Sequence, residues 1–143
     1  MPYIRVWIHL IWSTKNREKL ISPSLKSGLL VHLHENASEK EIFLSELNCM
    51  EEHCHALVSL GCTQTISKIM QLIKGESAHW INDNHLVRGH FEWQDEYIAV
   101  SVSESQIGKV RNYIQNQEIH HKKKTFAQEY DEFIKKYGFI KDS

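Results

Sequence analysis

The segment from Ile4 to Trp12 alternates strictly between two sets of side chains, which is the periodicity of a β-strand. Every even-numbered position in it is apolar, whereas the odd-numbered positions mix apolar side chains with Arg5 and His9. A strand with this pattern is covered on one whole face and, in places, on the other. We therefore expect the chain to begin with a strand, running to Thr14, that is packed on both sides over part of its length.

The rest of the chain alternates between helical and strand periodicities. Ser22 followed by Pro23 indicates a helix start, because a capping hydroxyl precedes a proline at the first helical position. A capping box is predicted at Ser103–Gln106. The patterns predict helices at 22–39, 65–84, 107–124 and 126–137, and further strands at 42–50, 54–60 and 91–102.

This order of elements indicates an α+β fold. It fits best a ferredoxin-like, RRM-like antiparallel sheet built on a split β-α-β unit, with helices on one face and additional helices at the C-terminal end. The chain has 143 residues, of which 41% are hydrophobic, so it can supply a core of its own. We expect a single domain over residues 1–143.

The overall charge does not predict tight binding to duplex DNA. Seventeen Lys and Arg residues against eighteen Asp and Glu residues give a formal net charge of -1. Any contact with nucleic acid must therefore come from local patches. Ten histidines make the net charge rise quickly as the pH falls through the range in which histidine titrates.

Cys49, Cys54 and Cys62 are an odd number of cysteines with no leader segment before them, so we expect free thiols in a reducing cytosol. A structural zinc site that joins them to His53 and His55 is an alternative, but their spacing lacks the paired short intervals of zinc ribbons and fingers. No apolar run approaches the roughly 18 residues that span a bilayer. The protein is therefore expected in the cytoplasm, without a membrane partner.

His53 and His55 flank Cys54 at the start of the third predicted strand. Because side chains two positions apart share one face of a strand, both imidazoles would point the same way and form a pair of potential metal ligands. Tyr113 and Gln117 lie one helical turn apart, which sets a phenol beside a third potential ligand. A metal ion next to a tyrosine indicates phosphoryl transfer.

Each of these signals also has a plainer interpretation. Two histidines in a strand are as often a surface pair or a core contact, and a tyrosine in a helix is usually a residue at the edge of the core. The other histidines, His9 among them, are expected at the surface or on helices without a role. His120 and His121 have no role that the residues alone predict.

The ordered set of motifs resembles that of the single-tyrosine HUH transposases of the insertion sequence 200/605 group. The resemblance includes the His53-Cys54-His55 motif, with Cys54 as a small hydrophobe in place of a bulkier apolar residue. It also includes the Tyr113–Gln117 segment, and it covers nearly the whole chain. The other similar segments are Val6–Arg17, Ile66–Ser77, Phe91–Gln94, Ser101–Ser103 and Asn116–His121.

The resemblance implies that His53, His55 and Gln117 hold Mg²⁺ or Mn²⁺. It also implies that Tyr113 attacks the scissile phosphate of single-stranded DNA, which yields a 5′-phosphotyrosine and a free 3′-hydroxyl. Such an attack needs a cation, because a phenol with a pKa of about 10 is a poor nucleophile at neutral pH. Rejoining would need no nucleotide cofactor, and the chain has no Gly-rich phosphate loop of the P-loop type.

The resemblance further implies a homodimer that cleaves and rejoins single-stranded DNA at hairpin-flanked element ends. Phosphate binding needs cations, and unpaired bases stack on exposed Trp or Tyr rings. The candidate DNA-binding residues are Arg5, Lys15, Arg17, Lys68, Lys74, Lys122, Lys123 and Lys124.

Two other functions stay open. A catalytically inactive or domesticated relative would only bind structured single-stranded nucleic acid. The near-neutral charge favours it, and so does the segment Glu96–Val100, which lacks the glycines common in the family there. An HUH nuclease of the replication-initiator or relaxase kind is more distant, because 143 residues leave no room for accessory domains. Strand cleavage in the presence of a metal ion separates the transposase from the binding protein.

Overall fold

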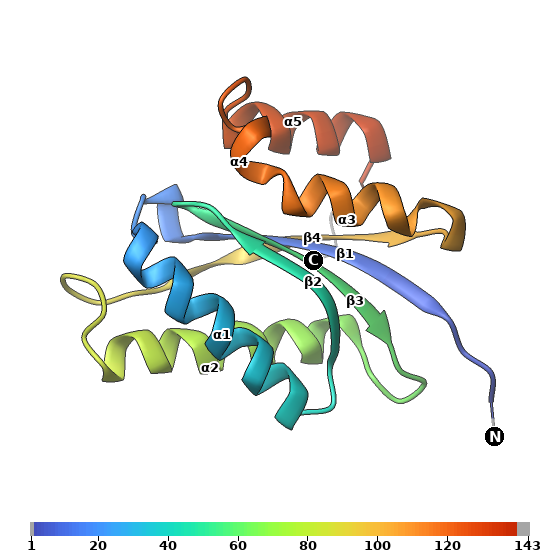
Figure 1. The fold of residues 1–143 in the computed structure, drawn as a ribbon, viewed down its shortest axis with the longest axis horizontal. Coiled ribbons are helices and arrows are strands. Elements are labelled where there is room, and N and C mark those ends of the chain that lie inside the picture. The colour runs from blue at the N-terminus through green and yellow to red at the C-terminus, as the bar shows by residue number, and fades with distance from the viewer. Residues whose placement is uncertain (1, 140–143) are drawn as a thin grey trace.

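The computed structural model describes residues 2–139, and a four-stranded antiparallel sheet forms its centre (Figure 1). The strands are β1 (Val6–Thr14), β2 (Phe43–Cys49), β3 (His53–Leu60) and β4 (Trp93–Val102). Their spatial order is β2-β3-β1-β4, and β1 pairs with both β3 and β4. Since β3 is inserted between β1 and β2, this is the order of a split β-α-β sheet, and the predicted ferredoxin-like fold is confirmed.

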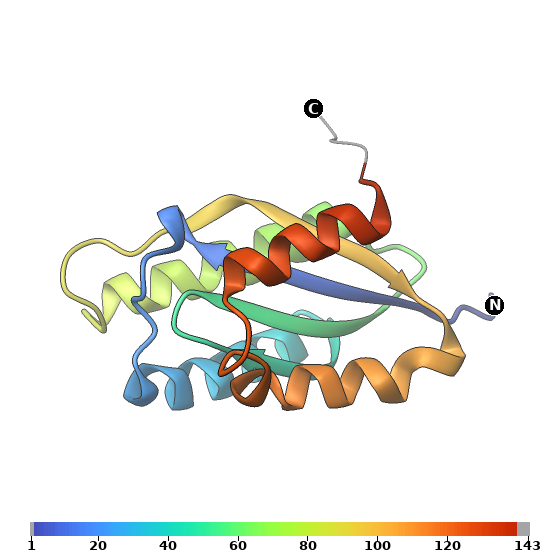
Figure 2. The same cartoon turned by 90° about the horizontal axis from the view of Figure 1, so that it is seen from above.

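Helices cover both faces of the sheet (Figures 1 and 2). One face carries α1 (Pro23–Glu39) and α2 (Ile66–Asp83). The other carries α3 (Ile107–Gln115), α4 (Gln117–His120) and α5 (Phe126–Tyr137), and Figure 2 shows α5 crossing over the strands. The C-terminal helices thus enclose the second face. Over residues 2–139, none of the helices combines the length and the apolar character needed to cross a bilayer.

The two faces of β1 have different partners, as its alternation predicts. Ile8, Leu10 and Trp12 enter the main core, which α1 and α2 complete. On the opposite face, Trp7 packs in a cluster with residues of α3, and Ile11 packs in a cluster with the start of α5. Burial of a large apolar side chain contributes roughly 1.5–3 kcal/mol. The odd-numbered face of β1 therefore helps to hold the C-terminal helices on the sheet.

The start of α1 follows the sequence signal. The Ser22 hydroxyl accepts a hydrogen bond from the Leu25 backbone N–H at 3.2 Å, and Pro23 occupies the first helical position. A proline is tolerated there because its missing N–H would have no partner inside the helix.

The capping box predicted at Ser103–Gln106 does not form. The segment is a single 3₁₀ turn, in which the Gln106 backbone N–H donates to the Ser103 carbonyl at 2.9 Å, and α3 begins only at Ile107. A reciprocal capping box forms instead between Thr125 and Gln128, at the start of α5. This cap fixes the point at which the terminal helix turns back over the sheet.

The helix predicted at 107–124 is broken at Asn116. The Asn116 backbone N–H still donates to the Asn112 carbonyl at 3.0 Å, but its φ and ψ of -98° and 23° are not helical. The short α4 then begins at Gln117, and the Asn116 carbonyl accepts a hydrogen bond from the backbone N–H of His120. Asparagine competes for backbone hydrogen bonds and so favours helix ends. The break changes the direction of the chain just before Gln117.

Cys49 and Cys54 form a disulfide across the β2–β3 hairpin, so the prediction of free thiols is wrong for these two residues. The hairpin sets them directly opposite each other, with Cα atoms 4.1 Å apart. Cys62 is free and exposed. Cys54 points into the main core, away from the face that carries His53 and His55. The thiols therefore do not reach the imidazoles, as the zinc alternative would require.

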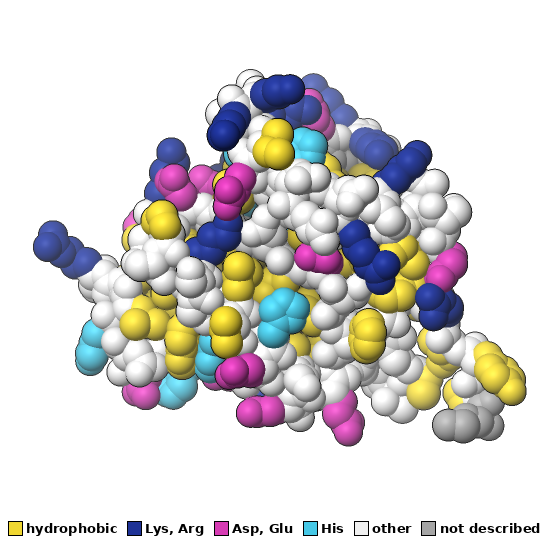
Figure 3. All heavy atoms as spheres, viewed as in Figure 1, with side chains coloured by type: hydrophobic (Ala, Val, Ile, Leu, Met, Phe, Trp, Pro, Cys, Tyr) yellow, Lys and Arg dark blue, Asp and Glu magenta, His cyan; other side chains and the backbone are white. Residues whose placement is uncertain are grey.

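Charged side chains are unevenly distributed over the face shown in Figure 3. Most Lys and Arg side chains lie in its upper part, over the C-terminal helices, with some Asp and Glu side chains among them, whereas the charged side chains along its lower edge, over α1 and α2, are Asp and Glu. The exposed lysines of the C-terminal helical region are Lys109, Lys122, Lys123, Lys124, Lys135 and Lys136. A chain with almost no net charge thus has a local cationic region.

Candidate active site

His53 and His55 point to the face of β3 that the C-terminal helices cover, as the strand periodicity predicts. Both imidazoles are fully buried, and their ring centroids are 5.1 Å apart. Across the sheet they pair with Ser13 and Ile11 of β1. The two potential ligands therefore lie on the rigid centre of the sheet, beneath the C-terminal helices.

A hydrogen bond at Nδ1 orients the imidazole of His53. Glu52 Oε1 lies 2.7 Å from His53 Nδ1. Burial raises the pKa of Glu52, but the hydrogen bond and charge of His53, with other cationic groups, lower it overall. A carboxylate can only accept here, so Nδ1 carries the proton and the lone pair of Nε2 faces the site. A carboxylate behind a histidine is typical of metal-binding imidazoles.

The imidazole of His55 is oriented by a second histidine. His9 Nε2 lies 2.9 Å from His55 Nδ1, and both rings are buried. When His9 accepts this hydrogen bond, the proton of His55 is on Nδ1 and its Nε2 lone pair is available to a metal ion. The expectation of a surface position for His9 is therefore wrong, because β1 places it directly beside β3.

Gln117 and Tyr113 lie beside the histidine pair, brought there by α3 and the break at Asn116. Gln117 is fully buried, and its Oε1 is 3.4 Å from His53 Nε2 and 3.0 Å from His121 Nε2. Its Nε2 donates to the backbone carbonyl of Tyr113 at 3.3 Å. The carboxamide oxygen of the predicted third ligand is therefore directed at the imidazoles.

Glu129 of α5 completes the cluster. Its Oε1 is 3.1 Å from His55 Nε2 and 3.5 Å from His53 Nε2. Its Oε2 accepts a hydrogen bond from the Tyr113 hydroxyl and lies 3.5 Å from His121 Nε2. One buried carboxylate therefore connects both imidazoles of the histidine motif to the phenol.

Burial and mutual contact shift the pKa values of these groups. Burial raises the pKa of the Tyr113 hydroxyl, and the hydrogen bond and negative charge of Glu129 raise it further. Burial also raises the pKa of Glu129, but hydrogen bonds and charge from His55 and Tyr113 outweigh it and lower that pKa to about 2. Burial lowers the pKa of His55 to about 4 and that of His9 to about 3. At neutral pH the site therefore holds the Glu129 carboxylate, neutral imidazoles at His9 and His55, and a protonated phenol at Tyr113. A metal ion binds deprotonated carboxylates and neutral imidazoles, so Glu129 and His55 are in the protonation states that a metal ion requires.

The donor set fits a divalent cation. One ligand atom from each of His53, His55 and Glu129 lies within 4.8 Å of the others, and the Gln117 oxygen adjoins them. Donor atoms that share one cation at about 2.0–2.1 Å lie roughly 3 Å apart, so the separations of 3.1–3.5 Å between Glu129 and the two imidazoles need only a small contraction. Nitrogen donors suit Mn²⁺ better than Mg²⁺, whereas the oxygen donors suit both.

Some of the cations predicted to contact DNA lie close to this cluster. Lys123 and Lys124 line a cavity of about 230 Å³ together with Tyr113, and Lys124 forms an ion pair there with Glu132 at 2.6 Å. Arg17 lies on another side, where its guanidinium stacks on the ring of Phe126. These residues border the candidate metal ligands or the phenol on two sides.

Other predicted DNA contacts lie farther away or are already paired. Arg5 and Lys15 form ion pairs with acidic side chains at 2.6 and 2.8 Å. Lys68 and Lys74 belong to α2, on the opposite face of the sheet. Lys74 is half-buried and donates to backbone carbonyls at the start of β4. The structure does not bring these four residues together with the histidine cluster.

Two residues of the cluster, His9 and Glu129, were not predicted, although each leaves a signal in the sequence. His9 interrupts the partly apolar odd-numbered face of β1. Glu129 lies three residues after Phe126 and four before Phe133, inside the apolar stripe of α5. Polar and charged side chains at such positions are rarely buried without a partner. Both positions therefore indicated buried polar contacts.

Comparison with known proteins identifies the family. The family described as Transposase IS200 like matches residues 3–117. The ISDra2 transposase TnpA of Deinococcus radiodurans is 26% identical over 114 residues, which cover 76% of this chain and 81% of that protein.

Two solved structures are similar in fold. A protein of Deinococcus radiodurans R1 assigned as a transposase, with a crystal structure at 1.90 Å resolution, has a TM-score of 0.66 and 27% identity, over 81% of this chain and 93% of that chain. The structure of a REP-associated tyrosine transposase bound to a REP hairpin has a TM-score of 0.65 and covers 85% of this chain and 72% of that chain. The sequence identity to this second protein is 14%, so the similarity to it is a similarity of fold. The family match spans most of the sequence, so this chain belongs to the IS200-like transposases, a family of enzymes that cleave and transfer DNA.

Proposed function

We propose that this protein is a metal-dependent tyrosine transposase that cleaves and rejoins single-stranded DNA at hairpin-flanked element ends. The observation that carries the proposal is the hydrogen bond from the Tyr113 hydroxyl to Glu129, because the same carboxylate lies against His53 and His55. A nucleophile and a candidate metal centre are thereby adjacent within one chain. This juxtaposition suits the transfer of a phosphoryl group to a phenol.

In the proposed cleavage step, Tyr113 Oη attacks the scissile phosphorus. The Oη–P bond forms as the P–O3′ bond breaks, so one DNA fragment keeps its 5′-phosphate as a phosphotyrosine ester and the other leaves with a 3′-hydroxyl. The phenolic proton is released to solvent as the Oη–P bond forms, and the departing 3′ oxygen takes up a proton from solvent. For rejoining, a 3′-hydroxyl attacks the phosphotyrosine and releases Tyr113, so no nucleotide cofactor is consumed.

His53, His55 and Gln117 are proposed to hold Mg²⁺ or Mn²⁺, with Glu129 as a further oxygen donor. A divalent cation bound there supplies Lewis-acid polarisation of the phosphate and offsets negative charge in the transition state. The surroundings of Tyr113 explain why such help is needed. Burial and the Glu129 carboxylate raise the pKa of its hydroxyl above the ordinary value, so the phenol keeps its proton at neutral pH.

The proposal includes a homodimer and a single HUH domain over residues 1–143. Structured single-stranded DNA is proposed to bind over the C-terminal helices, because exposed Lys and Arg side chains gather over these helices (Figure 3). Each exposed phosphate contact of this kind makes affinity fall with rising salt concentration. The hairpin-bound structural relative motivates the choice of hairpin substrates for the test below.

The test uses single-stranded oligonucleotides that cover the two flanks of the coding sequence, chosen to include any inverted repeats found there. The protein is incubated with them in Mn²⁺, in Mg²⁺ or in EDTA, and covalent protein–DNA adducts are measured by denaturing gel and intact mass. We expect an adduct only with a divalent cation. Tyr113→Phe should abolish it while binding persists, and His53→Ala should lose cleavage. Tyr3→Phe is the matched control, because the Tyr3 side chain is fully exposed and away from the cluster.

The outcomes separate the two functions that the sequence left open. An adduct that persists in Tyr113→Phe would exclude this tyrosine as the nucleophile. Tight hairpin binding by the unmodified protein with no adduct in either cation would favour a relative that only binds nucleic acid.

A further inference from the structure

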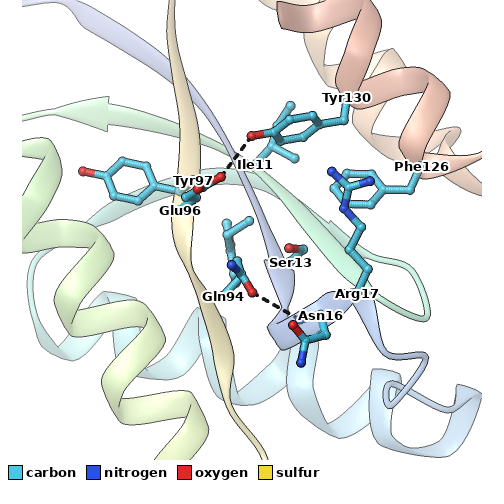
Figure 4. A pocket seen from close by; sticks show the side chains of 10 residues that line it. Ile11, Ser13, Asn16, Arg17, Gln94, Glu96, Tyr97, Phe126 and Tyr130 are labelled. Carbon is cyan, nitrogen blue, oxygen red and sulfur yellow. Dashed lines mark hydrogen bonds between the residues drawn. The ribbon is translucent and has the colours of Figure 1, made fainter. Parts of the chain in front are cut away.

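A cavity of about 300 Å³ lies beside the candidate active site, between the end of β1, the middle of β4 and α5 (Figure 4). Its volume is at the lower end of the range typical of small-molecule sites, and it is open to solvent on one side. The cleavage chemistry proposed above uses none of its polar side chains. The cavity is therefore a candidate binding site with polar side chains that the cleavage step does not require.

The wall on the α5 side consists of stacked planar groups. The Arg17 guanidinium lies over the rings of Phe126 and Tyr130, with its central carbon 5.2 and 4.8 Å from the two ring centroids. Figure 4 shows the guanidinium directly against the Phe126 ring. Among the described residues, no carboxylate forms an ion pair with Arg17, whereas Arg5 and Lys15 are both paired. Arg17 thus presents a flat cationic group to the cavity.

The opposite wall offers polar groups that can recognise an edge. Gln94 Oε1 accepts from the Asn16 backbone N–H at 3.1 Å, which leaves the Gln94 amide N–H groups without a partner in the described part of the chain. The Asn16 side-chain amide likewise makes no hydrogen bond within residues 2–139. Glu96 lies farther along β4, where it accepts from the Tyr130 hydroxyl at 3.5 Å. Donors and acceptors therefore converge on the cavity from the β4 side.

The backbone that presents Arg17 is held in an uncommon conformation. Asn16 and Arg17 have positive φ angles of 58° and 55°. Asparagine adopts this left-handed region fairly often, but for arginine it costs energy. The turn is fixed by the bond to Gln94 and by the Lys15 N–H, which donates to the Glu92 carbonyl at 3.0 Å. Strain that the surroundings maintain in this way is a feature of ligand sites.

The cavity adjoins the candidate metal centre through a single ring. Phe126 stacks on His53 with the ring centroids 4.0 Å apart and an interplanar angle of 9°, and Arg17 lies against the same Phe126. A DNA strand whose scissile phosphate reaches Tyr113 would therefore have a neighbouring nucleotide at this cavity.

We propose that the cavity binds one unpaired nucleobase of the DNA strand, next to the scissile phosphate. The base stacks against the Arg17–Phe126–Tyr130 wall, and the amides of Asn16 and Gln94 hydrogen-bond to its edge. Planar stacking on arginine and aromatic groups, combined with polar contacts to the base edge, is how unpaired bases are recognised. This inference rests on the proposed function, since it assumes that single-stranded DNA is the substrate.

The test scans a bound hairpin oligonucleotide with single abasic nucleotides. Affinity is measured by fluorescence anisotropy with the Tyr113→Phe protein, so that cleavage does not intervene. We expect one position beside the cleavage site where loss of the base weakens binding about tenfold. Arg17→Ala should weaken binding of the intact DNA by a similar factor, and the abasic substitution should then have no further effect.

Two variants separate stacking from charge. Arg17→Lys keeps the charge but not the planar group. In this variant, removal of the base at that position should no longer weaken binding, while the salt dependence of binding should stay unchanged. Arg88→Ala removes an equal charge from an exposed loop and should leave the abasic effect unchanged. The unfolding temperature of each variant is compared with that of the parent protein, to show that the variant is folded. The abasic series needs no such control, because it alters only the DNA.

Equal affinity for every abasic oligonucleotide, or wild-type behaviour of Arg17→Lys, would overturn the base site and leave Arg17 as a phosphate contact. If cleavage proceeds through Tyr113 with that result, only the base site fails. If no hairpin oligonucleotide binds, the proposed function and the base site fail together.

Discussion

Glu129 Oε1 lies 3.1 Å from His55 Nε2, which connects the terminal helix α5 to the central strand β3 across 74 positions of the chain. The family match ends at residue 117, so this carboxylate comes from a segment beyond it. Through its second oxygen, the same residue accepts the hydrogen bond of Tyr113. The terminal helix therefore contributes directly to the candidate metal centre and to the surroundings of the nucleophile.

Replacing Glu129 should weaken metal binding more than replacing Gln117. A carboxylate contributes charge as well as an oxygen, whereas a carboxamide contributes only an oxygen. We expect Glu129→Gln to lower Mn²⁺ affinity by about tenfold or more, on the scale of known losses at metal sites, and Gln117→Ala to lower it less. Isothermal titration calorimetry with Mn²⁺ and without DNA measures both. A larger loss for Gln117→Ala would show that the carboxamide is the dominant oxygen ligand.

His9 should act through His55, because its Nε2 is 2.9 Å from His55 Nδ1. Removal of this partner leaves a buried ring nitrogen without a hydrogen bond and frees the ring to reorient. We expect His9→Leu to lower Mn²⁺ affinity about 10- to 100-fold, and His9→Gln, which keeps an acceptor, to recover part of it. Equal Mn²⁺ affinity in His9→Leu and the unmodified protein would contradict this role.

The metal-free protein should lose stability as the pH falls from about 6.5 to about 4. The pKa of His9 is lowered to about 3 and that of His55 to about 4, so both stay neutral when folded but take up protons when unfolded. Each contributes up to about 1.4 kcal/mol per pH unit in this window, and this stability is fully present above it.

The loss should continue at lower pH because of Glu129. Its carboxylate has a pKa of about 2 in the folded chain, so its contribution is present above the unfolded value of 4.5 and disappears as the pH falls through 2. Urea unfolding in EDTA at a series of pH values measures the whole profile. His9→Asn should flatten the part between pH 6.5 and 4, whereas His34→Asn, on the exposed face of α1, should not. An unchanged slope in His9→Asn would contradict the assignment.

Only one thiol should be reactive in protein handled without reductant. Cys49 and Cys54 are paired and fully buried, whereas Cys62 is free and exposed. Titration with a thiol reagent should detect one group before reduction and three groups after reduction and unfolding. Closing a loop this short stabilises a chain by about 2 kcal/mol, so reduction should lower the unfolding free energy by about that amount. Three reactive thiols in denaturant without reductant would show that the pair is not bonded.

Local periodicity predicted most of the fold, because each strand and helix carries its own apolar pattern. The alternation of β1 correctly placed Trp12 in one core and Trp7 on the opposite face. The position of the helix break at Asn116 was not predicted, since the residues on both sides of it favour a helix and the interruption depends on packing over the sheet. The Cys49–Cys54 pair was also missed, because it depends on the register of the β2–β3 hairpin rather than on cysteine number.

The site was predictable only as far as its residues form motifs. His53 and His55 follow from strand periodicity, and Tyr113 with Gln117 from helical spacing and the family resemblance. Glu129 reaches the site through the path of α5 back over the sheet, which no local pattern specifies. Tertiary placement therefore determines which of the charged residues join the cluster.

We propose that one divalent cation binds between the histidine motif and the terminal helix, next to Tyr113. Crystals of the protein soaked in Mn²⁺ and measured at the manganese absorption edge test it most directly. We expect one strong anomalous peak, bound by His53 Nε2, His55 Nε2 and oxygen from Glu129 or Gln117, and adjacent to the Tyr113 hydroxyl. A peak elsewhere, or none at saturating Mn²⁺, would contradict it.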